Sequence, residues 1–429
     1  METPPDANLG LVVVIPCHNE PDVLPLLESL ARCHAAPCAV EVWWVVNHSR
    51  RASEAIQERN RETLQTLRQF MAAAASKDVD LPFRLGVIEA FDLPPKHAGV
   101  GLARKLGMDL AAERLRQVGC PEGIIVNLDA DCEVSTNYFD ALVSHFEAYP
   151  QTPGASLFYA HPLWGDLPEP HYVGITYYEL FLRYYTHGLR FSGFPFGFQT
   201  VGSSMAVRAN IYGKVGGMNR RKAGEDFYFL HKVIEQGNFS EINTLTVKPA
   251  ARVSDRVPFG TGKAMADYFE DPEVLYQQYP LAAFEILRAF VECVPVLYAA
   301  EQADACAEVQ ALDPVLFAFL QAQGLNAKIA EIQQNTTQFE SFQKRFFQWF
   351  NGFRVMKALH ALRDAYGNAP LLEESLRLLN VLYPEVLAAY RKKHDVAAEV
   401  DPAQETFTAT RLLDIYRQID RSAGPFLLK

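Results

Sequence analysis

Residues 124–135 read IIVNLDADCEVS, and this stretch contains both a strand and a candidate site. Residues 124–128 are apolar except for Asn127, a pattern typical of a buried strand. Asp129 and Asp131 follow, separated by one residue. Two unit charges roughly 4 Å apart repel by about 4 kcal/mol at an effective dielectric near 20, so we expect a cation between them. An exposed turn with helix-capping aspartates is the alternative.

The sequence around this stretch alternates between two periodicities. Strand patterns (residues 9–16, 40–47, 83–91 and 123–131) alternate with helix patterns (residues 22–33, 51–75 and 99–117). This alternation predicts an α/β fold with a mostly parallel sheet and helices on both faces. Ligands of such sheets bind beyond the carboxyl ends of the strands, where Asn47 and the two aspartates are expected to lie.

Composition limits the class of protein. The chain has 429 residues, a formal net charge of −11 and 49% hydrophobic residues, so we expect two domains with a sizeable core and no nucleic-acid partner. Its seven cysteines include no CxxC pair, which favours free thiols in a reducing compartment. No basic leader and no apolar run of membrane-spanning length are visible, so a cytoplasmic protein is expected, free or at the inner face of a membrane.

A second acidic motif stands at residues 224–237, GEDFYFLHKVIEQG. Glu225 and Asp226 begin an apolar-periodic helix, where acids can stabilise the helix dipole. Asp226 can equally act as a general base toward a substrate hydroxyl. The local sequence leaves both interpretations open.

Two glycine-rich segments are rejected as nucleotide fingerprints. GVGLAR (residues 99–104) has Arg104 where the third glycine belongs, and GTGKA (residues 260–264) ends without the required Ser or Thr. Arg104, Lys105 and Lys263 remain candidate phosphate partners, with ordinary surface charge as the alternative.

Taken in order, five segments resemble the family-2 glycosyltransferases of the GT-A type over roughly residues 10–265. They are VVVIPCHNE (12–20), VVNHS (45–49), GLARKLGMDLA (101–111), VNLDAD (126–131) and VGSSMAVRANIYGKVGGMNRRKAGEDFYFLHKV (201–233). The resemblance implies a nucleotide-diphospho-sugar donor, a carbohydrate or other hydroxyl acceptor, and Mn²⁺ or Mg²⁺ bound by Asp129 and Asp131. It also makes Asp226, next to Glu225, the catalytic base, which suggests an inverting reaction.

The same resemblance assigns a nucleotide-binding set: Pro16, His18, Asn19, Glu20, Asn47, Arg104 and Asp129. Asn47 stands where the family usually has an aspartate that reads uracil. Its amide both accepts and donates, so guanine or cytosine is as plausible as uracil. Asp255 is our candidate third metal ligand, with Arg252 as a phosphate partner, and an Asp–Arg surface pair is the alternative there.

We expect a GT-A-like domain at residues 1–265, with a nucleotide-binding part (10–135) and an acceptor-side part (136–265). The aromatic residues of 151–200 build a pocket wall or fill core. Residues 266–429 are expected to form a helical domain without clear strands. There an aromatic stripe from Phe342 to Leu359 is expected to be core, with an interfacial membrane helix as the alternative.

Two other functions remain open. A nucleotidyltransferase also places paired acids on Mg²⁺, but it would need a glycine-rich basic loop after the first strand, where this chain has CHNEPD. A non-catalytic nucleotide-sugar-binding protein is the second alternative, favoured by Asn47 and disfavoured by the intact acids.

Overall fold

The computed structural model describes residues 3–76, 80–222, 224–254, 260–299, 302–394 and 405–427. The chain divides into two compact units. The first, here called the sheet unit, comprises residues 1–168, 199–263 and 419–429. The second, the helical unit, comprises residues 169–198 and 264–418. The chain passes from the sheet unit to the helical unit at 263/264, but residues 169–198 also belong to the helical unit and residues 419–429 to the sheet unit. The predicted domain bounds, 1–265 and 266–429, stay a prediction.

The sheet unit is built on eight strands in the order β3-β2-β1-β4-β7-β6-β8-β5. The strands are β1 (Leu9–Cys17), β2 (Ala39–Ser49), β3 (Arg84–Leu93), β4 (Ile124–Asn127), β5 (Glu133–Val134), β6 (Gly154–Tyr159), β7 (Met205–Arg208) and β8 (Ser240–Lys248). The first four are mutually parallel, as the apolar runs predict. β7 is antiparallel to β4 and β6, so the second half of the sheet is mixed. The fold is therefore α/β, with a parallel half and a mixed half in one sheet.

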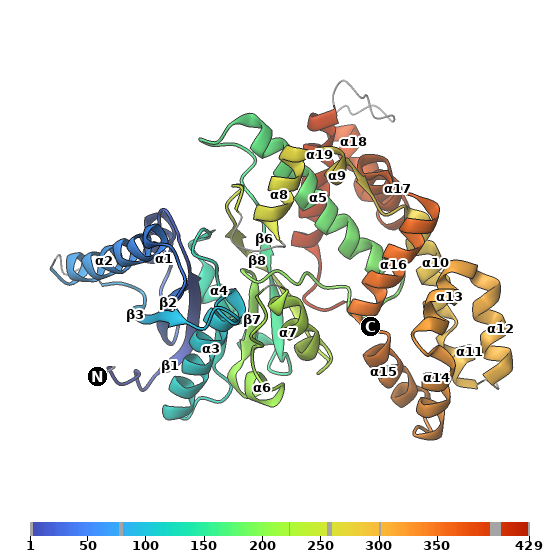
Figure 1. The fold of residues 1–429 in the computed structure, drawn as a ribbon, viewed down its shortest axis with the longest axis horizontal. Helices are drawn as coiled ribbons and strands as arrows, with labels where there is room; N and C mark the ends of the chain where they lie inside the picture. Colours follow the sequence, from blue (N-terminus) through green and yellow to red (C-terminus); the bar gives the residue numbers. More distant parts are fainter. Residues whose placement is uncertain are drawn as a thin grey trace. The chain divides into compact units, whose positions relative to one another are not determined.

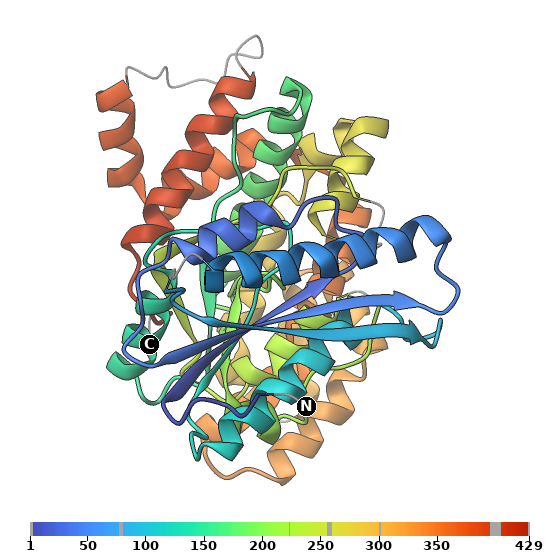
Figure 2. The same ribbon diagram turned by 90° about the vertical axis from the view of Figure 1, so that its left-hand side faces the viewer.

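Helices cover both faces of the parallel half of the sheet. Figure 2 shows α1 (Leu24–Ala31) and α2 (Glu54–Ser76) on one face and α3 (Val100–Gln117) on the other. Gly107 allows α3 to lie close to β1, because a Cβ at this position would meet the side chain of Val14. Three further helices complete the unit: α4 (Tyr138–Ala148), α6 (Ala209–Lys214) and α7 (Glu225–Ile234).

The helical unit contains the rest of the helices (Figure 1). They are α5 (Glu169–Phe191), α8 (Thr261–Glu270, which starts in the sheet unit), α9 (Glu273–Tyr276), α10 (Leu281–Glu292), α11 (Val294–Ala299), α12 (Gln302–Leu312), α13 (Pro314–Ala322), α14 (Leu325–Gln334), α15 (Phe339–Trp349), α16 (Gly352–Tyr366), α17 (Leu371–Leu382), α18 (Pro384–His394) and α19 (Glu405–Ser422, which ends in the sheet unit). One short antiparallel pair, β9 (Gln277–Gln278) with β10 (Ala369–Pro370), corrects the expectation of a strand-free region.

The aromatic stripe is mostly core, as predicted, with Phe353 and Met356 half-buried, and it belongs to two helices and not to one. α15 ends at Trp349, and the side chain of Asn351 caps the start of α16 by accepting from the backbone N–H of Arg354 at 3.3 Å. Phe346 is fully buried and packs on Phe290 of α10, with ring centroids 6.0 Å apart. Within the described residues, no helix is long and apolar enough to cross a bilayer.

Candidate functional site

Arg104 connects the two acidic motifs singled out in the sequence. Its Nη2 donates to Oδ1 of Asp129 at 2.6 Å, and its Nη1 donates to Oε1 of Glu225. The side chains of Arg104 and Glu225 are 4% and 2% exposed, whereas Asp129 is 37% exposed. Residues that are far apart in sequence, on α3, after β4 and at the start of α7, therefore meet at one buried guanidinium.

The electrostatics of this junction keep the arginine charged. Burial by itself lowers the pKa of Arg104, but the neighbouring carboxylates, led by Asp129 and Glu225, outweigh burial and raise it. Burial also raises the pKa of Glu225, and the positive charge of Arg104 opposes that effect. A buried carboxylate of this kind is held by its cation, so Glu225 serves the junction and does not merely cap α7.

Two glycines make room for the junction. A Cβ at Gly202 would lie 2.6 Å from Cζ of Arg104, where ordinary contact begins at 3.4 Å. A Cβ at Gly101 would meet the carbonyl oxygen of Arg221 and would lie 3.1 Å from Cβ of Glu225. Gly202 thus gives space to the guanidinium, and Gly101 lets α3 approach the segment before α7.

Asp226 begins the same helix but has a different environment. It is half-buried, and its Oδ1 accepts from the backbone N–H of Phe227 at 2.7 Å. Burial raises the pKa of Asp226, and Arg104 opposes the increase. Among the described residues, no cation pairs directly with this carboxylate, so Asp226 remains available to accept a proton.

A second arginine engages the other acid. Nη2 of Arg252 lies 2.5 Å and 2.6 Å from the two carboxylate oxygens of Glu20 and 3.2 Å from Oδ2 of Asp131. Glu20 is buried, whereas Arg252 and Asp131 are 26% and 24% exposed. Each of the two strand-end aspartates therefore has its own arginine. Sequence reasoning named Arg252 only as a phosphate partner and gave no signal for its pairing with Glu20.

A polar cluster connects the loop after β1 to the last part of β2 and to α2. His18 donates through Nδ1 to the backbone oxygen of Asn47 at 2.7 Å, and Asn60 of α2 donates to the same oxygen at 2.9 Å. The Oδ1 atom of Asn60 accepts from the backbone N–H of Asn19 at 2.9 Å. Asn60 is fully buried, and sequence reasoning missed it because a single asparagine in an amphipathic helix is unremarkable. Pro16 lies within β1, just before this cluster.

The side chain of Asn47 makes no hydrogen bond within the described part of the chain, although the residue is only 3% exposed. An amide held at a strand end with its donor and acceptor unused can read the edge of a base. The nucleotide role of Asn47 stays a prediction, and the arrangement does not distinguish uracil from cytosine or guanine.

The acidic pair also fits a divalent metal. Asp129 and Asp131 supply hard oxygen ligands, and Mg²⁺ commonly uses one or two carboxylates together with phosphate oxygens and water. In the described residues, no group of three His, Cys, Asp or Glu side chains is arranged to hold a metal. Asp255, the predicted third ligand, lies outside the described residues. Among the described residues, the candidate protein ligands are therefore these two carboxylates.

Lys105 and Lys263 are the other two candidate phosphate partners. Lys105 pairs with Asp109 at 2.9 Å along α3, which is ordinary helix-surface charge. Lys263 lies in the first turn of α8, so GTGKA is a helix start and not a phosphate loop.

Six of the 13 Phe, Tyr and Trp residues of the 151–200 segment are buried, for example Phe158 and Tyr159 in the sheet unit and Tyr184 in the helical unit, and six more are half-buried. Trp164 is the exception, at 80% exposed. It lies in the segment after β6, which is parallel to β4 because both are antiparallel to β7. Trp164 therefore follows a strand that ends at the same sheet edge as Asp129.

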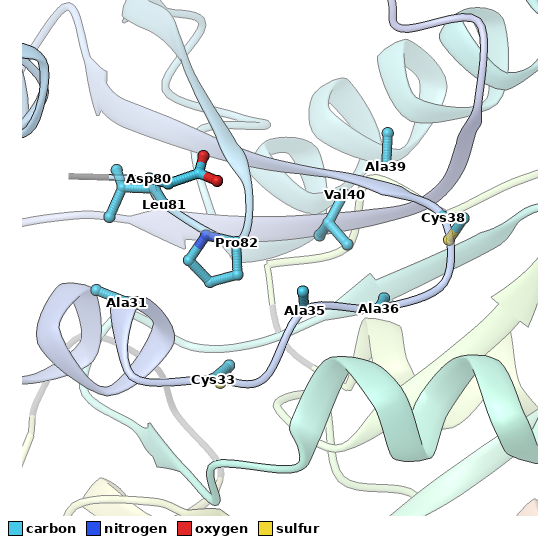
Figure 3. A pocket seen from close by; sticks show the side chains of 10 residues that line it. All are labelled: Ala31, Cys33, Ala35, Ala36, Cys38, Ala39, Val40, Asp80, Leu81 and Pro82. Atoms are coloured by element: carbon cyan, nitrogen blue, oxygen red, sulfur yellow. The ribbon is translucent and has the colours of Figure 1, made fainter. Parts of the chain in front are cut away.

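A cavity of about 360 Å³ lies elsewhere in the sheet unit. Figure 3 shows that Cys33, Cys38, Val40 and Pro82 are among the residues that line it. Ala39 begins β2, so this cavity is at the amino ends of the strands, opposite the candidate site. Its lining, as far as the chain is described, is mostly small and apolar and has no cation to bind a diphosphate.

No protein-family model matches the sequence, and no curated protein does. Among solved structures the chain is similar to S. aureus TarS 1–349 in complex with UDP-GlcNAc (14% identity, 96% of this chain and 91% of that chain, TM-score 0.38). It is also similar to mouse xyloside xylosyltransferase 1 (13% identity, 62% and 83%, TM-score 0.24). At such identities and scores, neither likeness assigns an activity to this chain.

Proposed function

We propose that this chain is a family-2-type glycosyltransferase that moves a sugar from a nucleotide-diphospho-sugar to an acceptor hydroxyl. The observation that carries the proposal is that Arg104 joins Asp129, a candidate diphosphate-side acid, to Glu225, which is adjacent to the candidate base Asp226. Arg104 would then help to position both the acid on the donor side and the helix that carries the base on the acceptor side. Hydroxyl acceptors and inversion at the anomeric carbon are part of this proposal.

In the proposed reaction, Asp226 takes the proton of the acceptor hydroxyl while that oxygen attacks the anomeric carbon. The bond from this carbon to the diphosphate oxygen breaks, and its electron pair leaves with the nucleoside diphosphate. Arg104 and Arg252 provide positive charge on the donor side, where negative charge develops. The pKa of Asp226, raised by burial, improves its strength as a base.

Mn²⁺ or Mg²⁺ is the proposed cofactor, which Asp129 and Asp131 would hold and which would neutralise charge on the leaving diphosphate. Asp131→Asn should lower Mn²⁺-dependent nucleotide affinity without unfolding the protein, since Asp131 is a partly exposed acid. Isothermal titration with UDP or GDP and Mn²⁺ measures this, and unchanged affinity would contradict the metal assignment. A cytoplasmic location, free or at a membrane surface, is the accompanying proposal.

The decisive experiment is hydrolysis and transfer from a panel of nucleotide-diphospho-sugars with Mn²⁺. Asp226→Asn should lower kcat by roughly a hundredfold to ten-thousandfold, the usual contribution of a positioned base, with donor affinity nearly unchanged. Asp140→Asn is a matched control, because Asp140 is an exposed acid in the first turn of α4.

The two alternatives give different outcomes. A nucleotidyltransferase would form a nucleotide-sugar from a nucleoside triphosphate and a sugar 1-phosphate and would release pyrophosphate. A non-catalytic binding protein would bind donors equally well before and after Asp226→Asn and would turn none of them over.

A further inference from the structure

Three consecutive cations, here called the basic loop, lie shortly before α7, which begins at Glu225: Arg220, Arg221 and Lys222. All three are exposed. None of them pairs with a carboxylate in the described part of the chain. By contrast, the cations of the site itself are engaged: Arg104 by Asp129 and Glu225, and Arg252 by Glu20 and Asp131. The basic loop is therefore uncommitted positive charge in a chain whose formal net charge is −11.

The backbone of the basic loop is held in place. Asn219 accepts from the backbone N–H of Arg221 at 3.0 Å and donates to the backbone oxygen of Glu225 at 2.9 Å. A Cβ at Gly99 would lie 3.1 Å from Cα of Lys222, so the loop also packs on the start of α3. The guanidinium of Arg221 lies over the ring of Tyr228, 3.8 Å from its centroid. Cations with this support lose less conformational freedom on binding an anion than cations on a mobile chain do.

The loop is also close to the proposed base. Lys222 is four residues from Asp226, a separation that spans at most about 14 Å even in extended chain. The basic loop leads into α7 and is not one of the loops after β1 and β2, where the nucleotide is expected. A ligand that contacts both the basic loop and Asp226 is therefore the acceptor.

We propose that the acceptor is anionic, and that the basic loop binds a phosphate or carboxylate group carried by it. This inference rests on the proposed function and specifies its substrate class. Arginine binds both groups through paired N–H donors, so the contacts do not distinguish phosphate from carboxylate.

The test uses the full chain and three labelled polymers: inorganic polyphosphate, polygalacturonate and neutral dextran. Fluorescence anisotropy should show binding of one or both polyanions, weakening as salt is raised, and no binding of dextran. Changing all three loop cations to glutamine should weaken polyanion affinity by about tenfold or more, since each exposed charge contact contributes modestly. A preference for polyphosphate or polygalacturonate identifies the anionic group.

The matched control removes an equal number of positive charges, three, from α18: Arg391→Gln, Lys392→Gln and Lys393→Gln. This variant should retain polyanion affinity. Equal loss in both variants would show a nonspecific charge effect and overturn the proposal, as would a loop variant that binds normally or a wild-type protein that binds neither polyanion.

Donor measurements separate this inference from the function on which it rests. Donor hydrolysis in water should be unchanged in the loop variant, because the acceptor does not take part. A loss of donor affinity would assign the loop to the donor diphosphate and refute the acceptor role. Polyanion binding without any donor turnover would instead refute the glycosyltransferase proposal and leave the anion site standing.

Discussion

Gly202→Ala tests the Arg104 junction with a single methyl group. The added Cβ would lie 2.6 Å from Cζ of Arg104 and closer still to both of its Nη atoms, and ordinary contact begins at 3.4 Å, so the guanidinium must move by at least about 0.8 Å. Arg104 is buried and bound on two sides by Asp129 and Glu225, so it cannot move away without lengthening one of these ion pairs. The backbone itself tolerates alanine, because Gly202 does not have a positive φ.

Two effects follow from that displacement. Overpacking of a buried site costs about 1–3 kcal/mol of unfolding free energy. A misplacement near 1 Å in a catalytic arrangement costs on the order of a hundredfold in rate. We therefore expect Gly202→Ala to fold, to unfold at lower denaturant concentration, and to lose about a hundredfold in sugar transfer or donor hydrolysis.

The control for this experiment is Gly213→Ala. Gly213 is an exposed glycine in α6, and a Cβ there would meet nothing within 4 Å. Alanine should be neutral at this position or stabilising by up to about 1 kcal/mol, with normal activity. Full activity in Gly202→Ala, measured beside this control, would show that the position of Arg104 does not matter to the reaction and would refute the reasoning.

Three further predictions concern separate features. Burial lowers the pKa of His231 from 6.5 to about 4, so the protein should lose stability as pH falls through that interval, and His231→Phe should reduce this loss in urea titrations at pH 7 and pH 5. Trp164→Ala should leave the melting temperature unchanged because the residue is 80% exposed. If the KM for the acceptor also stays constant, the Trp164 ring does not stack on the acceptor. Phe346→Ala should cost about 3–5 kcal/mol, whereas Lys344→Ala should cost less than about 0.5 kcal/mol by chemical denaturation, and equal costs would contradict a core role for the stripe.

The elements that the sequence predicts well are those with a local period. β1 is a continuous apolar run and β2 is apolar over residues 42–46, and both strands lie within two residues of their predicted bounds. α3 has the helix spacing and is observed at Val100–Gln117. Hydrophobic periodicity shows only which residues share a face. It therefore predicted the parallel half of the sheet but not that β7 lies between β4 and β6 and runs antiparallel to both.

The pairing of charges at the site has no such local signal. Arg104 lies 121 residues from Glu225, and Arg252 lies 121 residues from Asp131. Nothing in the spacing of either pair predicts contact, because a loop of that length can close in many ways. The acids were therefore identified from the sequence as a repelling pair, and the structure adds the arginines that neutralise them.

Those arginines do not hold the two acids equally. Arg104 is 4% exposed and is also required by Glu225, a buried carboxylate that would be costly to leave without a partner. Arg252 is 26% exposed and keeps both oxygens of Glu20 if Asp131 is withdrawn. A divalent cation competes for a carboxylate against its existing partner, so Asp131 is the acid that can be released at lower cost. Because of this asymmetry, Asp131 is the more sensitive position for testing metal binding. Arg104 is the more sensitive position for testing whether one arginine positions both Asp129 and Glu225.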